Sequence, residues 1–86
     1  MVERKVVVKN KTGLHARPAT LVVSEGNKFK SSITIKKGEK EVNIKSLLGL
    51  LGLGVAMGDE VIIKAEGEDE NQAVEAIVKL IENLNE

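Results

Sequence analysis

The one proline in this chain of 86 residues, Pro18, limits what the segment around it can form. Proline lacks a backbone N–H and its ring collides with the preceding helical turn, so a helix tolerates it only in the first turn. Apolar or small residues recur behind it at helical spacing: Ala19, Val22, Val23 and Gly26. Ahead of it, Gly13 interrupts the preceding pattern. The sequence therefore predicts a helix that begins between His15 and Pro18 and ends near Asn27.

The only histidine, His15, stands at this predicted helix start. The N–H groups of a first turn and the positive end of the helix dipole attract anions such as phosphate, and they favour neutral imidazole over imidazolium. A neutral imidazole nitrogen is a nucleophile, and Arg17 adds a permanent charge with a planar fork of donors. These residues favour a phosphoryl group carried on His15. The alternative is that His15 has no chemical role and that Arg17 is only a solvated helix residue.

The amino-acid composition excludes several kinds of site and partner. The chain has no cysteine and a single histidine, which excludes disulfides, thiol redox centres and metal sites built from several histidines. Its acidic residues show no calcium-loop spacing, and we expect no metal and no cofactor. Lysine and arginine balance aspartate and glutamate, 13 against 13, and Phe29 is the one aromatic residue, so nucleic acid is not an expected partner.

The hydrophobic runs of the chain are short. The apolar stretch from 2 to 8 is interrupted by charges and is too short for the core of a signal peptide. The longest apolar run also falls far short of a membrane span. We expect a cytoplasmic protein that forms a single domain over residues 1–86 and does not insert into a membrane.

Two kinds of hydrophobic pattern divide the rest of the chain. Apolar side chains alternate with polar ones in four segments, which predicts strands over 2–9, 32–36, 41–45 and 60–66. A turn that contains a glycine, at 37–39, joins the second and third strands into a hairpin. An apolar stripe from 73 to 84 predicts a last helix, and Asp69 with Gln72 resembles a capping box at its start.

The leucine-rich segment between the third and fourth strands predicts a short helix. Ser46 is a good N-cap, and Gly52 or Gly54 can end the helix. Four leucines cover every side of one helical turn: Leu47, Leu48, Leu50 and Leu51. A surface helix cannot bury all of them, so some should be exposed and form a partner surface. The glycines of this segment do not follow the order of a nucleotide-binding loop.

Together these elements predict an α+β fold with the order β-α-β-β-α-β-α. Each strand has one apolar face, as in a sheet that helices cover on one side only. A right-handed crossover from the first strand to the second leaves a gap that the fourth strand fills. We therefore expect a four-stranded antiparallel sheet with the spatial order 1-4-2-3, covered on one face by three helices.

The two most distinctive segments resemble the HPr family, the histidine-containing phosphocarrier proteins of the bacterial phosphoenolpyruvate-dependent sugar phosphotransferase system. They are Thr12-Gly13-Leu14-His15-Ala16-Arg17-Pro18-Ala19 and Val42-Asn43-Ile44-Lys45-Ser46-Leu47-Leu48-Gly49-Leu50. A third match, Asp69-Glu70-Asn71-Gln72-Ala73, opens the last helix. The resemblance covers essentially the whole chain. It implies an HPr-like open-faced β-sandwich, in agreement with the order of elements above.

The resemblance also implies roles for individual residues. His15 resembles the carrier histidine, which Enzyme I phosphorylates on Nδ1 and which passes the group to EIIA domains, and Arg17 resembles the residue that contacts the phosphoryl group. Ser46 resembles the regulatory serine that HPr kinase/phosphorylase modifies. Three leucines match apolar positions at which family members contact their partners: Leu47, Leu48 and Leu51. Many relatives have methionine at 48 and 51, which adapts to several surfaces better than leucine.

The implied function is that of a stoichiometric phosphocarrier in sugar transport, not an enzyme. Its implied partners are Enzyme I, EIIA domains, HPr kinase/phosphorylase and a transcription regulator of carbon catabolite repression, and we expect a monomer. One alternative is a nitrogen-related or regulatory paralogue that binds a transcription factor or an enzyme; some regulatory paralogues lack the histidine, which this chain keeps. The other is a small enzyme that uses His15 as acid or base, for which only Arg17, Thr12 and Thr20 lie close in the chain.

Overall fold

The computed structural model describes residues 1–85, so the last residue of the domain predicted over 1–86 lies outside it. The elements follow the predicted order: β1 (Val2–Val7), α1 (Arg17–Gly26), β2 (Ser32–Lys37), β3 (Lys40–Asn43), α2 (Leu47–Leu53), β4 (Glu60–Glu66) and α3 (Glu70–Glu82). The strands form one antiparallel sheet in the order β1-β4-β2-β3, which confirms the predicted topology.

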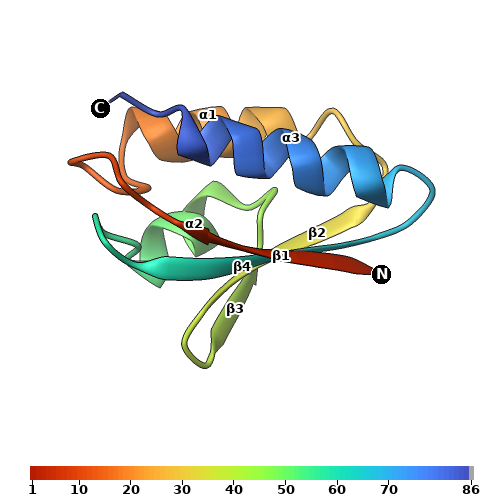
Figure 1. Ribbon diagram of the computed structural model, residues 1–86, viewed down its shortest axis with the longest axis horizontal. Helices are drawn as coiled ribbons and strands as arrows, with labels where there is room; N and C mark the ends of the chain where they lie inside the picture. The colour runs from red at the N-terminus through yellow and green to blue at the C-terminus, as the bar shows by residue number, and fades with distance from the viewer. Residues whose placement is uncertain (86) are drawn as a thin grey trace.

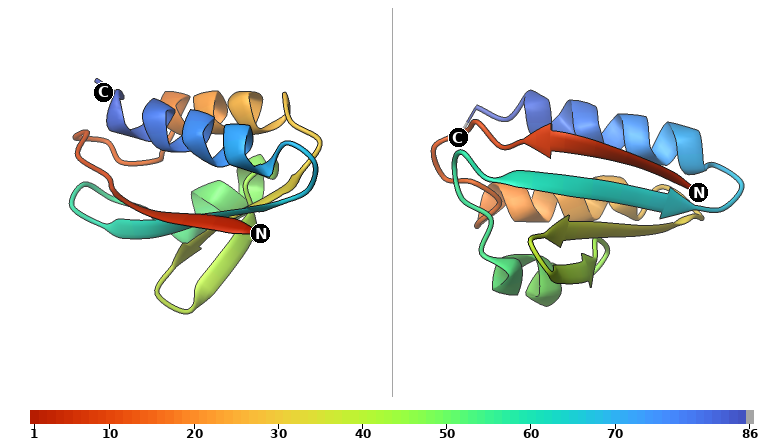
Figure 2. Two further views of the ribbon diagram at one scale, coloured as in Figure 1. Left: turned by 45° about the vertical axis from the view of Figure 1, so that its right-hand side comes forward. Right: turned by 60° about the horizontal axis from the view of Figure 1, so that its bottom comes forward.

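The helices cover one face of this sheet. Figure 1 shows α1 and α3 side by side above the strands, and the right-hand view of Figure 2 looks onto the opposite face, with the strands in front of the helices. α3 packs on β1 and β4, whereas α2 packs beside β3 and against α1. The other face of the sheet is left open, as the sequence predicts for an open-faced β-sandwich.

The alternation of side chains along the two central strands explains why only one face is covered. In β4 the buried side chains are Val61, Ile63 and Ala65, and in β2 they are Ile33 and Ile35. The register sets Ile33 opposite Ala65 and Ile35 opposite Ile63, so both sets lie on the same face. The residues between them point to the open face, because successive side chains of a strand alternate.

Two strands end earlier than the sequence predicts. β1 ends at Val7 and not at residue 9, although the N–H of Val8 still donates to the carbonyl of Asp59 at 2.9 Å. β3 ends at Asn43 and not at residue 45, because Oδ1 of Asn43 accepts the N–H of Lys45 at 2.9 Å. This local bond of an asparagine side chain turns the chain out of the sheet toward α2.

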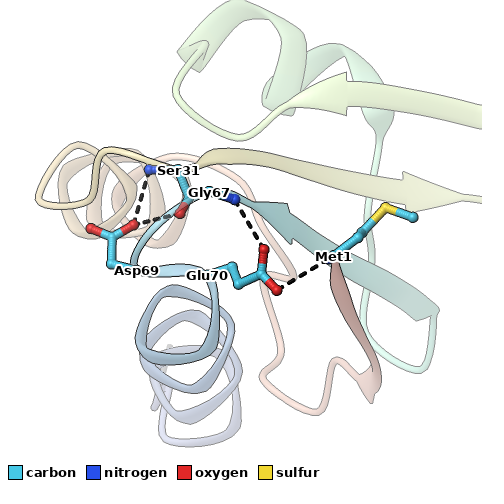
Figure 3. Close-up of polar contacts among 5 residues, drawn as sticks. All are labelled: Met1, Ser31, Gly67, Asp69 and Glu70. Atoms are coloured by element: carbon cyan, nitrogen blue, oxygen red, sulfur yellow. Dashed lines mark hydrogen bonds and ion pairs between the residues drawn. The ribbon is translucent and has the colours of Figure 1, made fainter.

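α3 begins where the sequence predicts, but the predicted capping box is wrong, because its side-chain hydrogen bond to the first turn does not form. Asp69 is the N-cap residue of α3, yet its carboxylate does not bond to the first turn of the helix. It accepts hydrogen bonds from the backbone N–H groups of Lys30 and Ser31, both at 3.0 Å. It also accepts one from the hydroxyl of Ser31, and Figure 3 shows both contacts with Ser31. Ser31 is only 1% exposed, so this carboxylate satisfies a buried hydroxyl at the start of β2.

The neighbouring carboxylate, Glu70, holds the chain just before α3. Its Oε1 accepts the N–H of Gly67 at 3.0 Å, and its Oε2 forms an ion pair with the amino group of Met1 at 3.1 Å (Figure 3). A Cβ at Gly67, which has φ +150°, would lie 2.6 Å from the hydroxyl oxygen of Ser31. Glycine is therefore required for the turn from β4 into α3 to pass this close to β2.

Candidate functional site

The loop that leads to His15 is pressed against the segment that follows α2. Gly13 has φ +65°, and a Cβ there would lie 2.3 Å from the carbonyl oxygen of Val55 and 2.7 Å from Cα of Ala56. The next residue, Leu14, is fully buried, and its N–H donates to the carbonyl of Val55 at 3.0 Å. The residue immediately before His15 is therefore anchored by both packing and a hydrogen bond.

A buried asparagine shapes the same loop from inside. Nδ2 of Asn10 donates to the carbonyl of Gly13 at 2.8 Å, and the N–H of Gly13 donates to the carbonyl of Asn10 at 3.2 Å. Asn10 is only 6% exposed, which is unusual for an asparagine in a turn. Because its amide replaces water as the partner of the loop backbone, it holds one conformation of the turn before His15.

His15 itself is exposed, and the residue after it has an unusual backbone conformation. Ala16, at φ 52° and ψ −124°, is the only residue other than glycine with positive φ in the described part of the chain. Such a conformation costs an L-residue on the order of 1–3 kcal/mol, so the surrounding structure must hold it. α1 begins at Arg17, which is exposed, with Pro18 buried in the second helical position. The predicted helix start is confirmed.

The positive end of the α1 dipole is not neutralised by any carboxylate in the first turn of the helix. The N-cap residue, Ala16, has no side-chain oxygen, and the turn contains no acidic residue. The positive end of the helix dipole and the guanidinium charge of Arg17 therefore lie within two residues of His15. A dianion attached to His15 would be stabilised by both.

Ser46 lies where the sequence predicts, at the N-cap of α2. Its hydroxyl oxygen accepts the N–H of Gly49 at 3.1 Å, and its carbonyl accepts the N–H of Leu50 at 3.0 Å. Ser46 is exposed, so its hydroxyl is open to solvent while it caps the helix. The predicted capping role is confirmed, and it is compatible with modification from outside.

The leucines of α2 divide between core and surface, as the sequence predicts. Leu50 and Leu53 are buried, whereas Leu48 is 84% exposed and Leu47 is 40% exposed. Leu51 is half-buried and packs against the core. Leu47, Leu48 and Leu51 are called the leucine patch below. Leu47 and Leu51 share a face because they lie four residues apart on one helix.

The two helices that carry the predicted site residues pack together in opposite directions. A Cβ on Gly26, the last residue of α1, would lie 3.0 Å from the side chain of Ile44, shortly before α2 begins. At the other end, Leu14 bonds to Val55, shortly after α2 ends. His15 and Ser46 therefore lie at opposite ends of this pair, separated by a ten-residue helix that is about 15 Å long.

Sequence reasoning missed the residues that fix the loop before His15. Val55 acts through its backbone carbonyl, so its side chain gives no signal of this role. Asparagine is common in surface turns, so the residue type at position 10 gives no signal. Only the burial of Asn10 reveals that it holds the loop. Alanine favours helices, so nothing in the sequence indicates the positive φ of Ala16. Gly13 is the one residue whose type signals the close approach.

Some sites are absent from the part of the chain that the structure describes. Residues 1–85 hold no group of three or more histidine, cysteine, aspartate or glutamate side chains that could bind a metal ion. Among the helices described, none has the length and apolar character that crossing a membrane requires.

Comparison with known proteins gives consistent matches over nearly the whole chain. A family model described as the PTS HPr component phosphorylation site matches residues 2–83. The chain is 50% identical over 82 residues to the HPr-like protein Crh of Halalkalibacterium halodurans, covering 95% of this chain and 98% of that protein. It is 45% identical over 83 residues to the phosphocarrier protein HPr of Mycoplasma pneumoniae, covering 95% and 94% of the two chains.

Solved structures of HPr proteins also match this chain over nearly its whole length. A crystal structure of HPr from Thermoanaerobacter tengcongensis matches with a TM-score of 0.94 and 51% identity, and the match covers 95% of this chain and 92% of that one. A second structure from that organism, of an HPr dimer, matches with a TM-score of 0.77 over 95% and 94% of the two chains. The site residues described above thus lie on a fold that is shared over 95% of this chain.

Proposed function

The chain belongs to the HPr family of phosphocarrier proteins, and from this premise we propose that it accepts a phosphoryl group on His15 and passes it on as a stoichiometric carrier. The donor is Enzyme I, charged by phosphoenolpyruvate, and the acceptors are EIIA domains of the sugar phosphotransferase system in the cytoplasm. The observation that best supports this proposal is the position of His15. It is exposed, it follows the fully buried Leu14, and it lies directly before the positive end of α1.

The proposed chemistry is a pair of phosphoryl transfers between nitrogen atoms. Nδ1 of His15 attacks the phosphorus of the phosphohistidine of Enzyme I, so one N–P bond forms as the other breaks. In a second displacement of the same kind, a nitrogen of EIIA attacks the phosphorus on His15, and the N–P bond to His15 breaks. The exposed position of His15 leaves room for the donor and acceptor to approach in line. The dianion on His15 is stabilised by the positive end of α1 and by the Arg17 guanidinium.

A second candidate function is favoured by the similarity to Crh. The HPr-like protein Crh of Bacillus subtilis is 48% identical to this chain, and a solution structure of it is described as that of a catabolite repression HPr. On this alternative, the chain acts by binding a transcription factor or an enzyme through the leucine patch, with Ser46 as the modified residue. The presence of His15 beside Arg17 supports the carrier in preference to a purely regulatory protein.

The experiment that separates the two functions is phosphorylation followed by mass analysis of the intact protein. Incubation with Enzyme I and phosphoenolpyruvate should add one acid-labile phosphoryl group, and H15A should add none while keeping its circular dichroism spectrum. Incubation with HPr kinase/phosphorylase and ATP should instead add one acid-stable group, which S46A should lack. Transfer that survives in H15A would overturn the carrier assignment, and wild-type protein that gains only the acid-stable group would favour the regulatory alternative.

The same samples report the oligomeric state. We propose that the carrier acts as a monomer, because the edge strand β1 carries the charged residues Glu3, Arg4 and Lys5, which disfavour pairing with a second sheet. Native mass spectrometry should then give the mass of one chain at every concentration. A doubled mass would instead indicate a dimer, as in the structure from Thermoanaerobacter tengcongensis.

A further inference from the structure

One lysine joins the end of β2 to the segment that follows α2. Lys37 is the last residue of β2, and its Nζ donates to the carbonyl of Gly54, the C-cap residue of α2, at 2.7 Å. The same Nζ forms an ion pair with Oδ2 of Asp59 at 2.9 Å. Both side chains are half-buried, with 35% and 31% exposed, so water screens this pair less than it would screen a fully exposed one.

Asp59 in turn closes the tight turn that follows α2. Its Oδ2 accepts the N–H of Ala56 at 2.8 Å, and its own N–H donates to the carbonyl of Ala56 at 3.0 Å. The N–H of Ala56, and then Lys37, hold the pKa of the Asp59 carboxyl below its usual value. The carboxylate is therefore ionised at neutral pH and bonded to both partners.

This turn borders the loop before His15 at both of its ends. At one end the carbonyl of Val55 accepts the N–H of Leu14 at 3.0 Å. The backbones approach so closely there that a side chain at Gly13 would collide with Val55. At the other end Val8 exchanges two backbone hydrogen bonds with the turn, to Asp59 at 2.9 Å and from Gly58 at 2.7 Å. The backbone from 8 to 14 thus takes its position from the 55–59 turn.

We propose that Lys37 and Asp59 are positioning residues for the phosphoryl site: their ion pair fixes the 55–59 turn, and the turn fixes the backbone that presents His15. Neither residue contacts the phosphoryl group. This proposal rests on the proposed carrier function, because it assigns what holds the carrier histidine in place. It predicts that the rate of the chemical step depends on an ion pair at the end of β2, through backbone contacts alone.

The test compares two lysines that each form one ion pair on the sheet. K37M removes the ammonium that joins Gly54 to Asp59, and K64M removes the ammonium that faces Glu41 at 3.7 Å on the open face. The exposed fractions of the two side chains are similar, 30% for Lys64 and 35% for Lys37. Both variants lose one positive charge, so a general effect of charge on docking is matched. K37R keeps the charge and the donors, and serves as the conservative variant.

Two readouts are needed, and only one of them depends on phosphoryl transfer. Amide hydrogen exchange at Leu14 reports the bond to Val55 directly, and we expect it to be faster in K37M but unchanged in K64M and K37R. Steady-state transfer from Enzyme I should show kcat lower by about threefold or more in K37M, with KM unchanged, because a displaced nucleophile slows the chemical step and not docking. A double variant, K37M with D59N, should be no slower than K37M alone.

Three results would overturn the positioning role. They are unchanged Leu14 exchange in K37M, equal slowing of transfer in K64M, and a change in KM alone. If K37M does not fold, D59N with K37R provides the same comparison of exchange and rate. If the wild-type protein accepts no phosphoryl group, the carrier function fails, whereas the exchange measurement still decides whether the ion pair fixes the loop.

Discussion

At the scale of single residues, the site depends on backbone conformations that only certain residues tolerate. Gly13 is held at positive φ against the carbonyl of Val55, and Ala16 is held at positive φ although it has a Cβ. Between them lies His15, exposed and followed by the exposed Arg17. The proposed phosphoryl site therefore lies at the surface, directly after the buried Leu14.

The Arg17 guanidinium should matter more after phosphorylation than before, because a dianion strengthens a charge-assisted hydrogen bond. We expect R17A to slow phosphoryl transfer by about tenfold, the effect of losing roughly 1.4 kcal/mol of transition-state stabilisation. Its thermal midpoint should not change, since Arg17 is exposed. The control is K28A, which removes a positive charge just beyond the other end of α1. Unchanged transfer with both Enzyme I and EIIA would show that the backbone and helix dipole suffice.

At the scale of elements, the seven residues of α2 carry a surface patch, and a capping residue flanks the helix at each end. Ser46 caps its start, the leucine patch lies along its exposed side, and Gly54 ends it in the left-handed conformation, at φ 70°. Because α1 and α2 are antiparallel, a charge at Ser46 lies a helix length from His15. Its effect should therefore be exerted on docking and not on the phosphoryl site itself.

We expect S46D to lower the rate of His15 phosphorylation by about tenfold at low ionic strength, and by less at high salt, because the added charge repels an acidic docking surface. The melting temperature should hold to within a few degrees, since aspartate is also a good N-cap. S32D, which adds the same charge on the open face of the sheet, is the matched control. Loss of α2 amide protection in S46D would replace this electrostatic account with a conformational switch, and an unchanged rate would leave Ser46 as a cap alone.

At the scale of the whole molecule, carboxylates join elements that are far apart in the chain. The pKa of Asp69 is held below its usual value, first by the hydroxyl of Ser31 and then by the N–H of Lys30. The pKa of Glu70 is lowered, first by the N–H of Gly67. A carboxyl group whose pKa is lower in the folded state than in the unfolded chain stabilises the fold above its unfolded value. That contribution is lost as the pH falls through the lowered folded value.

We therefore expect the free energy of unfolding to decrease as the pH falls below about 4, the usual range of these carboxyls. S31A should shrink the difference between urea unfolding at about pH 7 and about pH 3, because it removes the main cause of the lowered pKa of Asp69. S32A, at the exposed neighbouring position, is the control and should keep the wild-type difference. An S31A protein with the full pH dependence would show that the two backbone N–H groups alone hold the Asp69 carboxylate.

The sequence by itself determined the order of the elements, the single covered face of the sheet and a helix start between His15 and Pro18. These features are local or periodic: Pro18 restricts its own turn, alternation assigns each strand one buried face, and Ser46 caps the helix that it precedes. The family motif around His15 is equally local. A chain read in windows of a few residues contains all of this information.

Only the tertiary structure decided which distant groups meet. Asp69 resembles a local helix cap, yet its carboxylate binds Ser31, 38 residues away, because a buried hydroxyl and two backbone N–H groups converge on it there. Lys37 looks like a solvated strand end, yet it bonds to Gly54 and Asp59. No pattern in the sequence encodes such contacts, because they arise when packing of the apolar faces brings separate segments together and leaves their polar groups to find partners.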